Sequence, residues 1–322
     1  MESLLLPLKI FGYGIVTFLV VLYLIYFEQK IISFVQMRQS SKRTLGLRDT
    51  LFPIALFIRF FNSRLAFSET PYKFLYILSP IGLGGLLFAL GVFIPFHKSG
   101  LFWSSDYGIL WVIILSHLVV FLMMLIGWAS QTQYSLQGAM RLFGHFICFA
   151  LLFVFISLIV VLWAGSMNLV QIIHEQKSLW FAIPLFPVFI IYVIVLLMRS
   201  RGAPFGASES GINLMGGYKS RYAGGLLTFL VAIEYFQFLL FSGLAVVLFL
   251  GGWSPLWSVP RLSGFAWFFL KLIVFLMSIS WMKAILPNLR HDQIVRFSFK
   301  LFFPFIFILF VFYCFLKMMI RI

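Results

Sequence analysis

Eight long apolar stretches constrain the fold of this chain more than any other feature. A helix needs about 20 predominantly apolar residues to cross roughly 30 Å of hydrocarbon, and charges, prolines and glycines mark where such a run ends. Runs of this kind occur at approximately 6–27, 74–95, 108–128, 143–165, 180–198, 225–250, 266–285 and 302–319. None has the short alternating pattern of a membrane β-strand. The sequence therefore predicts an all-α integral membrane protein with eight transmembrane helices, forming a single domain over residues 1–322.

The overall composition excludes several classes of protein. The residues are 62% hydrophobic and 10% charged, whereas a water-soluble surface needs far more charge. Soluble enzymes and disordered tails are excluded on this ground. No basic segment with interleaved aromatic residues lies in a soluble domain, so we expect no nucleic-acid partner.

The basic residues predict the orientation in the membrane. The net charge is +15, and 17 of the 24 Lys and Arg residues lie in or beside the first, third, fifth and seventh connections. The positive-inside rule places these connections on the cytoplasmic or matrix side and both termini on the other side. Most such charges act as topology signals and contacts for anionic lipids. The alternative is a docking surface for a partner.

The first connection contains an amphipathic segment, GLRDTLFPIALFIRFFNSRL, at residues 46–65. Its apolar residues fall on one side and its arginines elsewhere, which predicts an interfacial helix after the first span. Two roles remain open for it: a surface anchor, or a wall for an amphiphilic ligand.

Cysteine and histidine do not indicate a metal site. Cys148 and Cys314 both fall within predicted spans, where isolated thiols are usually packing residues. The five histidines lie in different segments without ligand spacing. We expect no metal.

Glu234 lies about ten residues inside the apolar run 225–250. An ionised carboxylate at that depth is costly, so the side chain should face the interior of the bundle. Desolvation favours its protonated form. Two interpretations follow: a proton carrier, or a neutral acid that is hydrogen-bonded between helices.

Five stretches of the chain carry family motifs in a fixed order. They are EQKIISFVQMR (28–38), GWASQTQYSLQGAMR (127–141), MNLVQIIHEQKSLW (167–180), APFGASESGINLMGGYKSRYAGG (203–225) with IEY (233–235), and SWMKAILPNLRHDQIVRFSFKLFFP (280–304). Together they resemble subunit 1 of respiratory NADH:quinone oxidoreductase, complex I, over essentially the whole chain.

The resemblance implies a function that composition alone could not. The family has eight transmembrane helices, and its subunit provides the ubiquinone channel at the junction with the peripheral arm and couples quinone reduction to proton translocation. It carries no redox cofactor and no catalytic residue of its own; FMN and iron–sulfur clusters are expected in partner subunits only. The expected partners are the peripheral quinone-module subunits, the membrane-arm subunits, lipids and ubiquinone.

The resemblance also implies roles for particular residues. The expected quinone-channel residues are Glu28, Gln36, Arg38, Arg59, Phe205 and Glu209. Glu234 and Tyr235 are the expected proton-coupling residues. Arg290, Asp292 and Gln293 are expected to shape the last loop or to dock the peripheral arm. Taken singly, each has a plainer interpretation, for example Glu28 as a solvated helix end.

The chain departs from the family pattern mainly at its acidic positions. Ser40 and Ser41 replace a Gly-Pro, and His145 replaces a glutamine. Acidic positions are held instead by Leu56, Ala150, Arg199, Gly206, Gly211, Asn213 and Arg221. The coupling path that the resemblance implies therefore contains fewer carboxylates in this chain. Three accounts stay open: acids from partner subunits, proton transfer by waters and hydroxyls, or weakened coupling.

Two other functions compete with this interpretation. A stand-alone ion or proton transporter would act as the purified chain, but such proteins commonly contain internal repeats, and none is detected. A membrane subunit of a related hydrogenase-type complex would use no quinone and would lack flavin and iron–sulfur NADH dehydrogenase partners. For localisation, the divergent acids favour the mitochondrial inner membrane over a bacterial inner membrane.

Overall fold

The computed structural model describes residues 2–37, 72–96, 105–200, 204–205, 217–255 and 263–321. Every regular element within these ranges is a helix, in agreement with the predicted all-α fold. The predicted interfacial helix at 46–65 lies outside the described residues, as do Arg38, Arg59 and Glu209.

Seven helices in the described ranges are long and apolar enough to cross a membrane. They are α1 (Glu2–Val35), α4 (Lys73–Val92), α5 (Gly108–Ala129), α6 (Gln133–Ala164), α10 (Gly224–Phe249), α11 (Gly264–Ile285) and the helical run that begins with α12 (His291–Phe297), passes through a π-helical turn η3 (Ser298–Phe302) and ends with α13 (Phe303–Arg321). Each overlaps one of the apolar runs found in the sequence.

The fifth predicted span, 180–198, is a shorter helix than expected. Helix α8 (Phe186–Arg199) has 14 residues, or about 21 Å at 1.5 Å per residue, and residues 181–185 form turns. Pro187 lies in its first turn, where proline is tolerated. Most of the α8 side chains from Val188 onward are buried or half-buried, so protein and not lipid surrounds much of this helix. The count of eight crossings stays a prediction.

Helix α6 begins earlier than the predicted span at 143–165. It starts at Gln133, after Thr132, whose hydroxyl accepts from the Ser135 backbone N–H at 3.3 Å. A threonine N-cap of this kind satisfies one of the free amides of the first turn. The polar first turns therefore belong to the same helix as the span.

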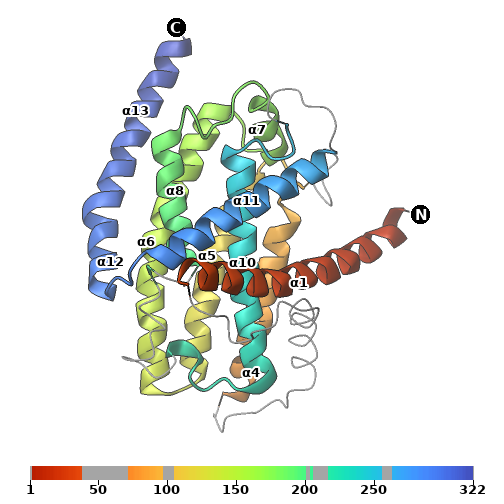
Figure 1. The fold of residues 1–322 in the computed structure, drawn as a ribbon, viewed down its shortest axis with the longest axis vertical. Helices are drawn as coiled ribbons and strands as arrows, with labels where there is room; N and C mark the ends of the chain where they lie inside the picture. The colour runs from red at the N-terminus through yellow and green to blue at the C-terminus, as the bar shows by residue number, and fades with distance from the viewer. Residues whose placement is uncertain are drawn as a thin grey trace.

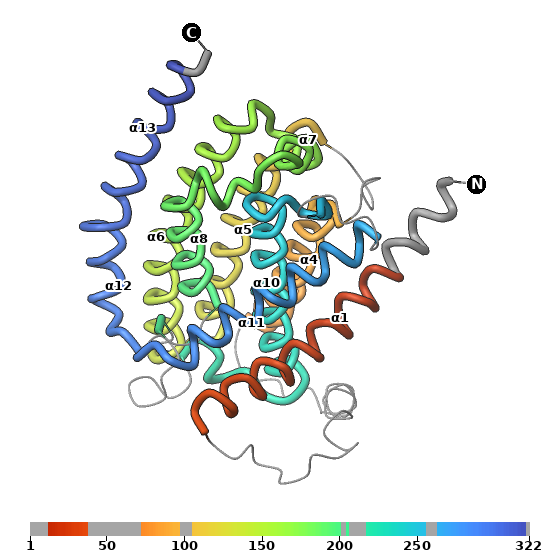
Figure 2. Tube along the Cα trace, turned by 45° about the horizontal axis from the view of Figure 1, so that its top comes forward, coloured from red at the N-terminus to blue at the C-terminus, as the bar shows by residue number. Residues whose placement is uncertain are grey.

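The helices are arranged as an upright group crossed by two oblique helices. Helices α4, α5, α6 and α10 run roughly side by side, whereas α1 and α11 cross the bundle obliquely (Figures 1 and 2). Helix α13 stands at the edge, with its C-terminus projecting beyond the bundle. The oblique course of α1 and α11 brings distant parts of the sequence together on α10.

Hydrogen bonds in and beside the described connections group them at two ends of the bundle. At one end, Ser135 Oγ donates to Tyr218 O at 2.8 Å, and Leu289 N donates to Pro204 O at 2.7 Å. At the other end, Ile109 N donates to Met167 O at 3.1 Å. The third, fifth and seventh connections thus meet at one end, as expected for an alternating membrane chain.

Lys271 lies inside a predicted span and binds the segment that follows α10. Its ammonium donates to the carbonyl oxygens of Leu250 and Ser254 at 2.6 Å each and of Gly252 at 3.0 Å. It also lies 4.4 Å from the centroid of the Trp180 ring. This lysine satisfies the carbonyls that follow α10, where no further helical turn can bind them.

Candidate functional site

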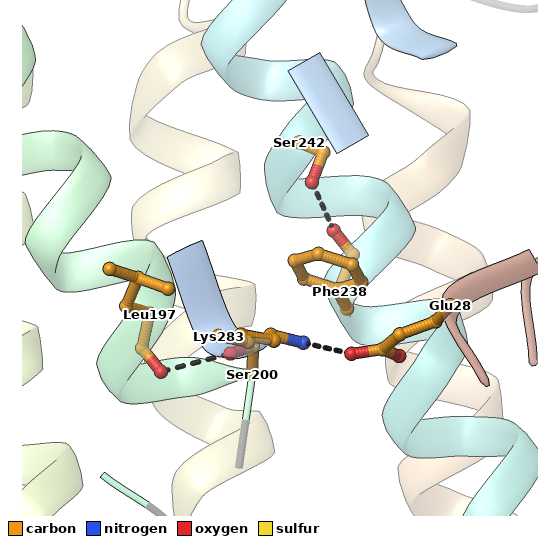
Figure 3. Close-up of polar contacts among 6 residues, drawn as sticks. All are labelled: Glu28, Leu197, Ser200, Phe238, Ser242 and Lys283. Carbon is orange, nitrogen blue, oxygen red and sulfur yellow. Dashed lines mark hydrogen bonds and ion pairs between the residues drawn. The ribbon is translucent and has the colours of Figure 1, made fainter. Parts of the chain in front are cut away.

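The first element of the site is a buried ion pair between α1 and α11. Lys283 Nζ donates to Glu28 Oε1 at 2.7 Å, and the two side chains are 3% and 7% exposed, respectively. Lys283 also lies 3.9 Å from the centroid of the Phe238 ring on α10 (Figure 3). A carboxylate and an ammonium that are both removed from water require each other. Glu28 is therefore not a solvated helix end.

Gln36 lies close to the same pair, two turns further along the chain. Its Nε2 donates to the Ala284 carbonyl at 3.5 Å, next to Lys283, while its side chain remains exposed. Two of the predicted channel residues, Glu28 and Gln36, therefore meet the end of α11.

An apolar cavity of 270 Å³ lies along the same three helices. Its lining includes Tyr13 and Val16 of α1, Leu240 of α10, and Phe269 and Leu272 of α11. The α1 lining residues precede Glu28 by 8 to 16 positions, which is about 12–24 Å along a helix. The polar pair and the apolar cavity therefore lie at different depths of one helix interface.

Glu234 of α10 forms the second polar cluster. It binds the phenol of Tyr218 through Oε1 and the ammonium of Lys219 through Oε2, and the Lys219 and Glu234 side chains are 11% and 14% exposed. The sequence leaves open a proton carrier or a neutral, hydrogen-bonded acid, and the contacts in this arrangement are those of an ion pair. Tyr235, the next residue, is half-buried against the apolar core.

The third polar cluster surrounds Arg199 at the end of α8. The residue is 3% exposed, and its Nη2 donates to Ser116 O at 3.2 Å. With the oxygen of its carboxamide facing the guanidinium, Gln237 accepts from Nη2 at 3.1 Å. The guanidinium carbon lies 3.8 Å from the ring centroid of Phe241 and 4.2 Å from that of Phe149. Aromatic faces stabilise such a buried cation.

Helix α10 is common to all three clusters. Glu234 contacts Lys219, and Phe238, four residues later, contacts Lys283. Gln237 and Phe241, which are also four residues apart, both contact Arg199. Residues four apart lie on one face of a helix. Two neighbouring faces of α10 therefore meet three basic side chains within about two turns.

The other predicted residues that the structure describes are Phe205, in the fifth connection, and Arg290, Asp292 and Gln293, at the start of α12. Phe205 is 7% exposed and follows Pro204, whose carbonyl binds Leu289 N. Gln293 Oε1 accepts from Arg290 N at 3.0 Å and so closes the first turn of α12. The side chains of Arg290, Asp292 and Gln293 are all exposed. This geometry is compatible with a structural or docking role.

The partners of these candidate residues were not predicted from the sequence. In the sequence, Lys219 and Lys283 are only two of several charges in the connections. The sequence also does not predict the contact between His145 of α6 and His291 of α12, whose Nε2 and Nδ1 atoms, respectively, lie 2.5 Å apart. These partners lie 15, 255 and 146 positions apart in the chain. In the part of the chain that is described, no group of three or more His, Cys, Asp or Glu residues could hold a metal ion.

Comparisons with known proteins agree with the motifs. The family model described as NADH dehydrogenase matches residues 8–314. An NADH-quinone oxidoreductase subunit of Ruthia magnifica is 33% identical over 89% of this chain and 83% of its own length. The NADH-ubiquinone oxidoreductase chain 1 of Arabidopsis thaliana is 30% identical over 92% of each chain. The chain therefore belongs to the NADH dehydrogenase family of complex I membrane subunits and is a multi-pass inner-membrane subunit of an NADH–quinone oxidoreductase.

Proposed function

We propose that this subunit forms the ubiquinone-access channel of the complex and couples quinone reduction to proton translocation. The observation that carries the proposal is the arrangement of the buried Glu28–Lys283 pair and the apolar cavity on one interface of α1, α10 and α11. An amphiphile with a polar head and a long isoprenoid tail needs such a combination. The proposed channel residues are Glu28, Gln36, Arg38, Arg59, Phe205 and Glu209.

In this proposal the chain supplies the passage, and partner subunits supply the electrons. Reduction of a quinone takes two electrons and two protons, and the electrons come from FMN and iron–sulfur clusters bound by those partners. The residues of this chain admit the tail, hold the head near the polar end of the interface and exclude bulk water. We further propose Arg290, Asp292 and Gln293 as docking residues for the peripheral arm, and the mitochondrial inner membrane as the location.

Glu234 and Tyr235 are the proposed coupling residues. Glu234 lies one turn of α10 from Phe238, which packs on Lys283. A change of charge near the Glu28–Lys283 pair therefore acts over a short distance on the Glu234 carboxylate, in a region of low dielectric constant where such fields are strong. Glu234 then gains or loses a proton in step with quinone reduction.

Replacing Glu234 with glutamine tests this function. The variant should assemble, because the amide has the shape of the acid. The number of protons translocated per NADH oxidised, measured as proton uptake by sealed vesicles, should fall by about tenfold or more, because no proton can be carried at that position. Glu175→Gln is the matched control: this glutamate is exposed on α7 (Leu169–Glu175), at the opposite end of the bundle. Sealed membrane vesicles that report both NADH oxidation and proton uptake supply the measurement. Normal values of both in Glu234→Gln would refute the coupling role.

A further inference from the structure

Two partners of Glu234 belong to the connection that precedes α10. Tyr218 and Lys219 lie in the short helix η2 (Gly217–Lys219), just before α10 begins. Both bind the carboxylate of Glu234. We refer to residues 217–222 as the η2 loop.

The η2 loop is held firmly against three helices. Ser135 Oγ of α6 donates to Tyr218 O at 2.8 Å. The Tyr222 ring stacks on Tyr76 of α4, with the ring centroids 4.2 Å apart and an interplanar angle of 2°. The Tyr222 hydroxyl donates to the carbonyls of Tyr76 and of Ile126 in α5, at 3.3 Å each. The loop therefore presents Lys219 from a defined position.

Gly138 of α6 permits the close approach of this loop. A Cβ atom at position 138 would lie 2.8 Å from Tyr218 N and 2.9 Å from Gly217 C. These are backbone atoms, so the loop as a whole would have to move away to accommodate any side chain. The position of Lys219 thus depends on a tight backbone contact between α6 and the loop.

The two partners of Glu234 set its charge. Within the bundle, desolvation by itself favours the neutral acid, whereas a nearby ammonium and a phenolic donor favour the carboxylate. The ammonium of Lys219 therefore opposes the effect of desolvation on Glu234. The same connection also contains Pro204, whose carbonyl accepts from Leu289 N in the loop before α12.

We propose that Lys219 is a positioning residue for the coupling reaction: it is an internal counter-ion that favours the ionised form of Glu234 and so governs how readily Glu234 takes up a proton. The inference rests on the proposed role of Glu234.

The test compares three replacements of Lys219 in the assembled complex. Lys219→Met removes the charge, Lys219→Gln keeps a hydrogen-bond donor without the charge, and Lys219→Arg keeps the charge. Lys300→Met is the matched control, since Lys300 is an exposed lysine of η3. Native gels measure assembly, and sealed vesicles measure protons moved per NADH oxidised.

We expect Lys219→Met and Lys219→Gln to lower the number of protons moved per NADH at least twofold while NADH oxidation continues, and Lys219→Arg to restore the ratio. Lys219→Met combined with Glu234→Gln should give the ratio of Glu234→Gln alone, because both changes act on one interaction. A normal ratio in Lys219→Met overturns the inference. If Glu234→Gln is impaired in the same assay, the proposed function survives that result; if Glu234→Gln is also normal, the proposed function fails as well.

If Lys219→Met yields no complex, the amount of complex formed by the double variant tests the inference instead. Removing one partner of a buried pair leaves an uncompensated charge, and removing both does not. Recovery of the complex in the double variant would support the pairing. Loss of the complex in both variants would show that the lysine is needed for loop packing and not for its charge, which overturns the inference.

Discussion

Replacing Lys283 with methionine is expected to reduce the stability of the subunit by about 3–5 kcal/mol, because it leaves the Glu28 carboxylate buried without its counter-ion. The Glu28 and Lys283 side chains are 7% and 3% exposed, and their charged atoms lie 2.7 Å apart. The change also removes a cation from the face of the Phe238 ring. The expected result is little or no assembled complex on a native gel, and a lower midpoint of thermal inactivation for what remains.

Two further variants separate the charge of this pair from its shape. Glu28→Gln combined with Lys283→Met removes both charges and should recover much of the assembled complex, since no ion is then left unpaired. Lys283→Arg keeps the cation and should assemble. If Lys283→Met alone has the thermal midpoint of the unmodified complex, the pair contributes nothing to stability and Glu28 does not depend on its counter-ion.

The helices of the fold could be predicted because hydropathy is read locally. An apolar run shows directly which residues can lie in the hydrocarbon of the membrane. The ends of the runs at 108–128 and 225–250 therefore match those of α5 and α10 to within one residue. The run at 180–198 is longer than its helix, because residues 181–185 form turns and α8 begins only at Phe186. Most side chains of α8 from Val188 onward are covered by protein. Local hydropathy cannot distinguish a protein-lined helix from a lipid-lined one.

The candidate site could be predicted only in part, for a different reason. Glu28 and Glu234 stand out in the sequence because carboxylates are rare in a chain of this kind. Their partners do not stand out: Lys283 is 255 positions from Glu28, and Lys219 lies among other loop charges. A pairwise interaction becomes visible only when the oblique helices α1 and α11 are placed across α10. The charge state of Glu234 was open for this reason, since desolvation and a counter-ion act in opposite directions.

The surroundings of Arg199 predict the effect of placing a glutamate at this position by a single substitution. The family resemblance implies a glutamate at this position. The surroundings in this chain suit a cation: the Ser116 carbonyl accepts from the guanidinium, and the ring faces of Phe149 and Phe241 lie within 4.2 Å of its central carbon. The negative face of an aromatic ring attracts cations and repels anions.

Replacing Arg199 with glutamate is therefore expected to be more damaging than replacing it with an apolar residue. An ionised carboxylate at this depth costs roughly 2.5–3.5 kcal/mol on insertion scales, and the cation–π attraction, about 2 kcal/mol for a desolvated pair, is lost as well. Arg199→Met fills a similar volume and should keep more of the assembled complex than the glutamate, since it places no anion against the negative faces of the Phe149 and Phe241 rings. The amount of complex on a native gel, measured beside Arg199→Lys, ranks the variants.

The expected order is Arg199→Lys, then Arg199→Met, then Arg199→Glu, which should be close to undetectable. Full assembly and increased proton ejection in Arg199→Glu would mean that the site still accepts an acid, and that this chain lost its coupling carboxylate without rebuilding the surroundings. The expected order has the opposite meaning. It would show that Gln237, Phe149 and Phe241 form a site for a fixed positive charge, so that a route for protons through this part of the bundle cannot be regained by one substitution.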